Sequence, residues 1–186
     1  MPLSIRHRSP LIAAPIDGGR RRALGTLGLA TLGAASLAAL SPRVALAQSS
    51  PEEYVTMTAK ADTFTKTLAE AATERGEADA VKTFAELEIG EVNALMEVLA
   101  AAGAPASVEL DPEQQQIIEQ MQGMEGAEFD AQFLQAQLTG HQKALEIQQP
   151  MADMSEITIP VAAAKLAEES IKSHIAMLEM IQGQMG

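Results

Sequence analysis

The chain has 186 residues, contains no cysteine and carries a formal net charge of −12. Without cysteine, disulfides, thiolate metal sites, thiol catalysis and the covalent attachment of c-type haem are excluded. An acidic chain repels phosphate backbones, so nucleic acid is not an expected partner, whereas cations are attracted.

The first 47 residues have the features of a cleavable export signal. Three arginines at 20–22 precede an uncharged run over 23–40, and residues 45–47 read Ala-Leu-Ala, a pattern that a signal peptidase reads. The paired arginines favour a twin-arginine signal, with a general secretory signal as the alternative. A retained anchor is disfavoured by the several Gly, Ser and Thr residues of the run. We therefore predict cleavage near Ala47 and a periplasmic or secreted protein.

Residues 48–186 are expected to form one domain with its own core and no membrane span. After residue 47 the chain keeps seven basic and 24 acidic residues, a net charge of −17. Such a surface keeps an exported protein soluble, and it also draws cations towards the molecule.

Helical signals dominate the chain after residue 47, and no alternation of period two is long enough for a strand. The first helix has Ser50 as its N-cap, Pro51 at its first position and Glu53 completing a capping box. Gly76 ends it. A second helix is predicted over residues 77–102, before Gly103.

The second half of the chain predicts two further long helices. Asp111 and Pro112 restart a helix that Gly123 and Gly126 interrupt, and the longer piece spans about 127–149. Pro150 ends or kinks that piece because it lacks an amide donor. A last helix spans about 160–182. Four long helices predict an all-α fold, a four-helix bundle.

Two glutamates, Glu88 and Glu91, lie within the apolar stripe of the second helix. A carboxylate removed from water must be paired, protonated or bound to a cation. The stripe repeats at intervals of three and four, and it comprises Val81, Phe84, Glu88, Glu91, Leu95, Val98 and Ala102.

The two histidines after residue 47, His141 and His174, are also in register with apolar residues of their helices. His141 follows Leu138, and His174 follows Ile171, at a spacing of three. Three helices thus each direct a ligand-type residue, Glu or His, towards one core.

Carboxylate and imidazole ligands suit zinc, iron, manganese or copper, so a divalent transition metal is the cofactor that these residues indicate. The candidate metal ligands are Glu88, Glu91, His141 and His174. A hydrogen-bonded Glu/His cluster without metal is the alternative. A di-iron centre or a metal-dependent oxidase is disfavoured, because Glu-x-x-His pairs are missing at both histidines. No reaction, substrate or oligomeric state can be read from the sequence.

Methionines supply a separate hint, since three pairs are spaced by three residues. Thioethers are soft ligands for Cu(I), and His174 precedes Met177 by three positions, so a Cu(I)-holding site of Met and His is a further alternative. Methionine is also an adaptable core filler. The pairs are Met121 and Met124, Met151 and Met154, and Met177 and Met180.

Three segments together resemble the ferritin-like family of exported bacterial proteins catalogued as domain of unknown function 4142. They read FAELEIGEVNAL (84–95), GAEFDAQFLQAQLTGHQKALEIQQ (126–149) and IKSHIAMLEMI (171–181). The resemblance covers about residues 54–181 and implies an exported helical bundle. It also implies a G-x-x-F-D segment before an inward histidine, and a second histidine in the last helix. The matching residues are Gly126, Phe129, Asp130, His141 and His174.

This chain departs from the pattern at one place. Many members carry an Asp-His pair where this chain reads Glu91-Val92, which removes one potential ligand. For Asp130 we expect a structural role, in which a carboxylate early in a helix meets the helix dipole.

Overall fold

The computed structural model describes residues 49–185, so the predicted export signal lies outside the described residues. Within this range the chain forms five helices and no strand. They are α1 (Pro51–Arg75), α2 (Asp79–Ala101), α3 (Pro112–Met121), α4 (Gly126–Ala152) and α5 (Ile159–Met185). The all-α prediction is thereby confirmed for the described part of the chain. None of its helices has the length and apolar character that crossing a membrane requires.

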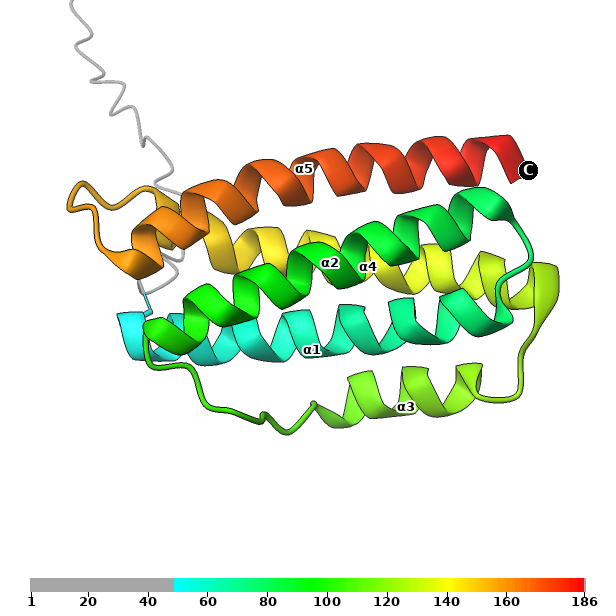
Figure 1. The fold of residues 1–186 in the computed structure, drawn as a ribbon, viewed down its shortest axis with the longest axis horizontal. Coiled ribbons are helices and arrows are strands. Elements are labelled where there is room, and N and C mark those ends of the chain that lie inside the picture. The colour runs from blue at the N-terminus through cyan, green and yellow to red at the C-terminus, as the bar shows by residue number, and fades with distance from the viewer. Residues whose placement is uncertain (1–48, 186) are drawn as a thin grey trace, which may run out of the picture. The chain divides into compact units, whose positions relative to one another are not determined.

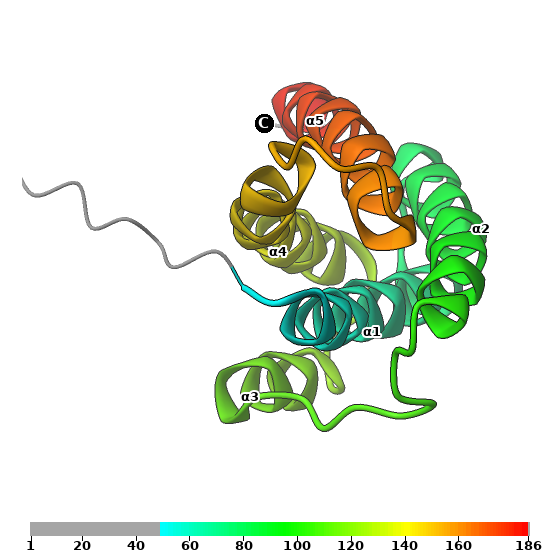
Figure 2. The same cartoon turned by 90° about the vertical axis from the view of Figure 1, so that its left-hand side faces the viewer.

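The four long helices form a bundle with α1 and α4 on one side and α2 and α5 on the other (Figure 2). Each long helix runs antiparallel to its two neighbours (Figure 1). The short helix α3 lies outside the bundle against α1 and α4, and it carries the chain back so that α4 runs in the same direction as α2.

The predicted start of α1 is confirmed in detail. The hydroxyl of Ser50 accepts a hydrogen bond from the Glu53 amide at 3.2 Å, and the Glu53 carboxylate accepts one from the Ser50 amide at 2.8 Å. This reciprocal pair satisfies two backbone donors that a helix start leaves free. Pro150 lies inside α4, which continues only to Ala152, so it precedes the end of the helix by two residues.

The G-x-x-F-D segment anchors the turn between α1 and α2. Gly126 starts α4 with a φ of +62°, a conformation that glycine adopts without strain. The buried Asp130 carboxylate accepts hydrogen bonds from the amides of Glu77 (3.1 and 3.2 Å) and Ala78 (2.8 Å). Its role is structural, as expected, but its partners are at the start of α2 rather than in its own helix.

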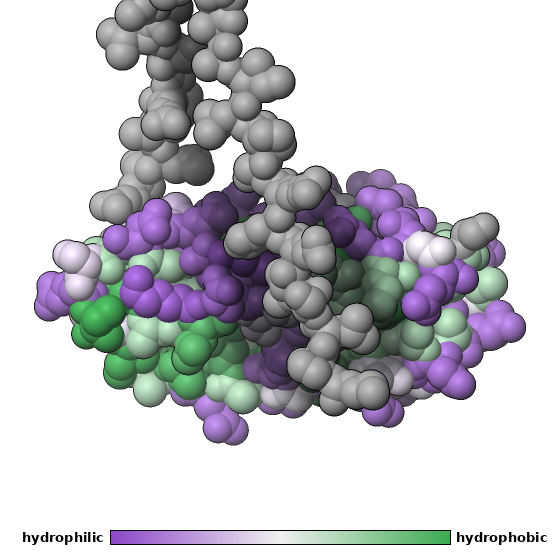
Figure 3. Space-filling model, turned by 90° about the horizontal axis from the view of Figure 1, so that it is seen from above, coloured by the Kyte–Doolittle hydropathy of each residue, from purple (hydrophilic) through white to green (hydrophobic). Residues whose placement is uncertain are grey.

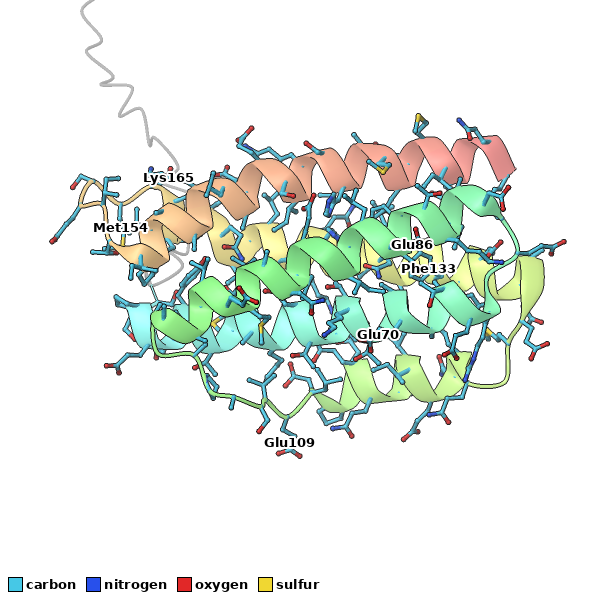
Figure 4. The ribbon with its side chains drawn as sticks, viewed as in Figure 1. Glu70, Glu86, Glu109, Phe133, Met154 and Lys165 are labelled. Carbon is cyan, nitrogen blue, oxygen red and sulfur yellow. The ribbon has the colours of Figure 1, made fainter. Side chains whose placement is uncertain are left out.

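The interior consists of two apolar clusters with a polar layer between them along every long helix. One cluster contains Phe84, Phe129 and Phe133, and the other contains Tyr54 and Leu99. Figure 4 shows Phe133 between the helices, whereas Glu109 in the loop before α3 points away from the bundle. The polar layer is the part of the core that apolar packing does not explain.

The paired methionines mostly belong to these apolar clusters. Met121, Met124 and Met177 pack in the first cluster, and Met151 and Met154 pack in the second. Met180 is more than half exposed. Their surroundings are those of core-filling side chains.

We expect Asp130→Ala to lower the free energy of unfolding by about 3 kcal/mol, because two backbone amides at the start of α2 lose their buried acceptor. Glu128→Ala, an exposed change in the same helical turn, should cost less than about 0.5 kcal/mol. Urea unfolding of both variants measures the difference. Equal losses would contradict the anchoring role of Asp130.

Candidate functional site

Three buried polar side chains meet in the polar layer, one from each of three helices. They are Glu88 of α2, His141 of α4 and His174 of α5, with exposed fractions of 2%, 3% and 5%. Nε2 of His141 lies 3.3 Å from Oε2 of Glu88 and 3.1 Å from Nδ1 of His174. Nδ1 of His174 lies 3.1 Å from the same glutamate oxygen. The structure therefore brings together three of the four predicted ligands.

The outer hydrogen bonds of the two histidines fix which ring nitrogens carry protons. Nδ1 of His141 donates to the backbone carbonyl of Gln137 at 2.8 Å, because a carbonyl can only accept. Nε2 of His174 faces Oε2 of Glu91 at 3.2 Å, and that carboxylate also only accepts. In the neutral rings the nitrogens that face Glu88 are therefore the ones without a proton.

Three lone-pair acceptors consequently face one another in the core. A tetrahedral ion with bonds of about 2.0–2.1 Å separates its ligand atoms by about 3.4 Å. The three distances between the ligand atoms of Glu88, His141 and His174, at 3.1–3.3 Å, are close to that separation. The cluster thus has the spacing of one face of a tetrahedral site, and it needs a positive charge, a proton or a metal ion, at its centre.

Glu91, the fourth predicted ligand, lies at the edge of the cluster. Its side chain is 44% exposed and contacts the outer nitrogen of His174, while Ser170 donates a hydrogen bond to it. The prediction that Glu91 faces the core is wrong, because the helix repeats every 3.6 residues and drifts away from a strict alternation of three and four. The buried face of α2 includes Glu88, Val92 and Leu99 instead.

The carboxylate and the imidazoles change the pKa of one another. Burial alone raises the pKa of Glu88, but hydrogen bonds with His141 and His174 outweigh it and hold the pKa well below its usual range. Burial lowers the pKa of His174, but the hydrogen bond and charge of Glu88, together with Glu91, raise it overall. The cluster therefore favours an ionised glutamate beside a positive charge.

Asp62 of α1 is a polar residue of this region that the sequence interpretation missed. Its Oδ2 atom is buried and has no hydrogen-bond partner among the described residues. Burial, followed by the charge of Glu88, raises the pKa of Asp62 to about 8. The sequence holds a signal for it, since an inward face at spacings of three and four runs through Val55, Thr58, Asp62, Thr65 and Ala69.

A cavity of about 440 Å³ opens beside the cluster. Side chains of α2 and α5 form most of its wall, and Asp62, Glu88 and His174 are among its lining residues. On the other side of the histidines, the ring of Phe84 packs edge-on against His174, with centroids 5.4 Å apart. The cluster is therefore closed by an aromatic ring on one side and open to a cavity on another.

The fold and the site together define a small all-helical domain with a buried Glu/His/His group. The chain belongs to the family described as "Domain of unknown function (DUF4142)", whose model matches residues 35–181. The family prediction is thereby confirmed.

Among solved structures, the chain is similar to the crystal structure of a DUF305 fragment from Deinococcus radiodurans. The TM-score is 0.64 at 18% sequence identity, over 72% of this chain and 95% of that one. This likeness supports the helical fold alone. The comparison with curated proteins found no match.

Asp62 should make the metal-free protein less stable as the pH rises. Its pKa is about 8 in the folded state and about 4 in an unfolded chain, so the folded state keeps a proton that the unfolded state loses between these values. Its contribution to the free energy of unfolding therefore falls between pH 4 and 8. Asp62→Asn should remove this dependence and flatten the stability profile by about 1 kcal/mol per pH unit.

Urea unfolding at pH 5, 6, 7 and 8 in the presence of a chelator measures the two profiles. The exposed Asp153→Asn serves as the matched control and should retain the original slope. Parallel profiles for the Asp62→Asn variant and the original protein would contradict the raised pKa of Asp62.

Proposed function

We propose that this protein is an exported, periplasmic bundle of the ferritin-like type that holds one divalent transition-metal ion between Glu88, His141 and His174. The observation that carries the proposal is the approach of three lone-pair acceptors to within 3.1–3.3 Å of one another. Such an arrangement is unfavourable without a cation between the atoms. The ligand atoms of these residues all lie within 4.8 Å of one another.

The donor set indicates what kind of ion fits. Two imidazole nitrogens and one carboxylate oxygen suit zinc, copper, iron or manganese, and they suit calcium and magnesium poorly. Three protein ligands leave a further coordination position, for which the cavity beside the cluster provides room. The carbonyl of Gln137 and the carboxylate of Glu91 act as the outer partners that orient ligating histidines in metalloproteins.

The proposed location rests on the sequence before residue 48. Its basic start, uncharged run and Ala-Leu-Ala end support export, and the paired arginines support the twin-arginine route. The strongly acidic remainder suits a protein that meets metal ions outside the cytoplasm.

The purified protein should bind one divalent ion per chain. His141→Ala and His174→Ala should each weaken binding at least about 100-fold, whereas Glu91→Gln should weaken it about tenfold because it removes an outer partner only. Gln142→Ala, an exposed change next to His141, is the matched control. Calorimetric titration with Zn²⁺ and elemental analysis after dialysis measure affinity and stoichiometry.

Failure to retain any ion, with cooperative unfolding preserved in both histidine variants, would contradict the metal site and favour the hydrogen-bonded core. Retention of Cu(I) that survives Glu88→Gln but fails in Met177→Leu or Met180→Leu would favour the thioether alternative.

Export should depend on the paired arginines. Replacing Arg21 and Arg22 with lysine should abolish processing of the leader and leave the protein in the cytoplasm, because the twin-arginine route reads the arginine pair. Cell fractionation followed by immunoblotting measures the location and size of the product. Unchanged export would contradict the twin-arginine route while leaving a general secretory signal possible.

A further inference from the structure

The cavity between α2 and α5 has an apolar wall and an acidic base. Its wall includes Leu95 and Val98 of α2 and Leu166 and Ile171 of α5, with small alanines between them. Leu166 and Val98 are 76% and 43% exposed, so the apolar surface continues outwards from the cavity. Figure 3 shows apolar residues gathered at the end of the molecule where α5 begins. A ligand of this cavity therefore needs an apolar body.

The base of the cavity carries carboxyl groups and two imidazoles, but no side chain with a permanent positive charge. Three carboxylates line it, from Asp62, Glu88 and Glu91, and none of its lining residues is a lysine or an arginine. The contacts of Glu88 and Glu91 are with the two histidines, whereas Oδ2 of Asp62 is buried without any partner. Burial keeps Asp62 protonated up to about pH 8 in the empty cavity. A ligand that brings a charged donor would stabilise the ionised carboxylate and give its buried oxygen a partner.

We infer that this cavity binds a small molecule with a linear or branched alkyl body and one ammonium head, and that the ammonium donates to Asp62 while the alkyl body lies between α2 and α5. This inference goes beyond the metal site, because Asp62 is outside the group of three metal-type ligands. The cavity volume of about 440 Å³ is in the range of pockets that hold small organic molecules.

The cavity has no lysine or arginine to donate to its carboxyl groups, and this lack determines which head group a ligand needs. A carboxylate head would face three acidic side chains and be repelled. A hydroxyl head would donate one hydrogen bond but bring no charge to stabilise the ionised form of Asp62. Only an ammonium supplies both a donor and a compensating charge, so the cavity should rank ligands of equal length in the order amine, alcohol, carboxylate.

The test is a calorimetric titration of the chelator-treated, full protein at pH 9, where Asp62 is ionised and alkylamines are still protonated, with butyl-, hexyl- and octylammonium, each below its micellar concentration. Affinity should rise about threefold to fourfold for each methylene that becomes buried. Octanol should bind at least tenfold more weakly than octylammonium, and octanoate should not bind. Equal affinity for the three head groups, or no binding of any amine, would overturn the inference.

Variants locate the binding to the two parts of the cavity. Asp62→Asn should weaken octylammonium at least tenfold, with Asp153→Asn as the matched control that keeps the original affinity. Ala162→Phe, which narrows the wall without touching Asp62, should weaken octylammonium more than butylammonium. An unchanged affinity in the Asp62→Asn variant would overturn the inference, since its folding is checked by its urea transition.

The titration also separates this inference from the metal proposal. Zn²⁺ binding that persists in a protein without affinity for amines overturns the ammonium site alone. Amine binding by a protein that does not bind Zn²⁺ when titrated with it overturns the metal site alone.

Discussion

The mutual approach of Nε2 of His141, Nδ1 of His174 and Oε2 of Glu88 is the constraint on which the interior of this protein depends. Three acceptors at 3.1–3.3 Å repel one another unless a positive charge lies among them. The histidines cannot turn their protonated nitrogens inwards without breaking the bonds to Gln137 and Glu91. The cluster is therefore held in a form that accepts a positive charge, either a proton or a metal ion.

The fold supplies the force that keeps these groups together. Along every long helix the polar layer lies between two apolar clusters, one around Phe84 and Phe133 and the other around Tyr54 and Leu99. Burial of these large side chains sets the spacing and register of the helices, since apolar packing is the dominant favourable contribution to folding. The polar residues then meet because of their positions along helices that the apolar residues have already aligned. A second buried network, in which Tyr54 donates to Gln148 at 2.7 Å, reinforces the register between α1 and α4.

Sequence periodicity could predict the helices and the three central side chains, because Glu88, His141 and His174 each lie near the middle of an apolar face. It could not resolve residues at the edge of a face. Glu91 and Val98 follow the same spacing rule as Glu88, yet both are more than 40% exposed, because a helix of 3.6 residues per turn rotates them out of the interface.

Asp62 was missed for the complementary reason. The first helix has two adjacent faces whose residues recur at spacings of three and four. The apolar side chains are larger on the face without Asp62, so the sequence alone indicates that face as the buried one. Asp130 shows a third limit, since its partners lie 52 and 53 residues away, beyond the reach of any local pattern.

The distribution of lysines explains why a cation from outside the chain suits this interior. Among the described residues, Lys60 pairs with Asp111, Lys143 with Glu113, and Lys172 with Glu168 and Glu169, all on the outside of the bundle. A lysine placed at the base of the cavity would neutralise Asp62 and Glu88 permanently, since its ammonium is attached to the chain. Its absence from the cavity wall leaves the carboxylates available to a charge that can enter and leave. A cavity that is apolar along its wall and has carboxyl groups at its base thus offers different partners to different cations: imidazoles to a metal ion, and the apolar wall with Asp62 to an alkylammonium.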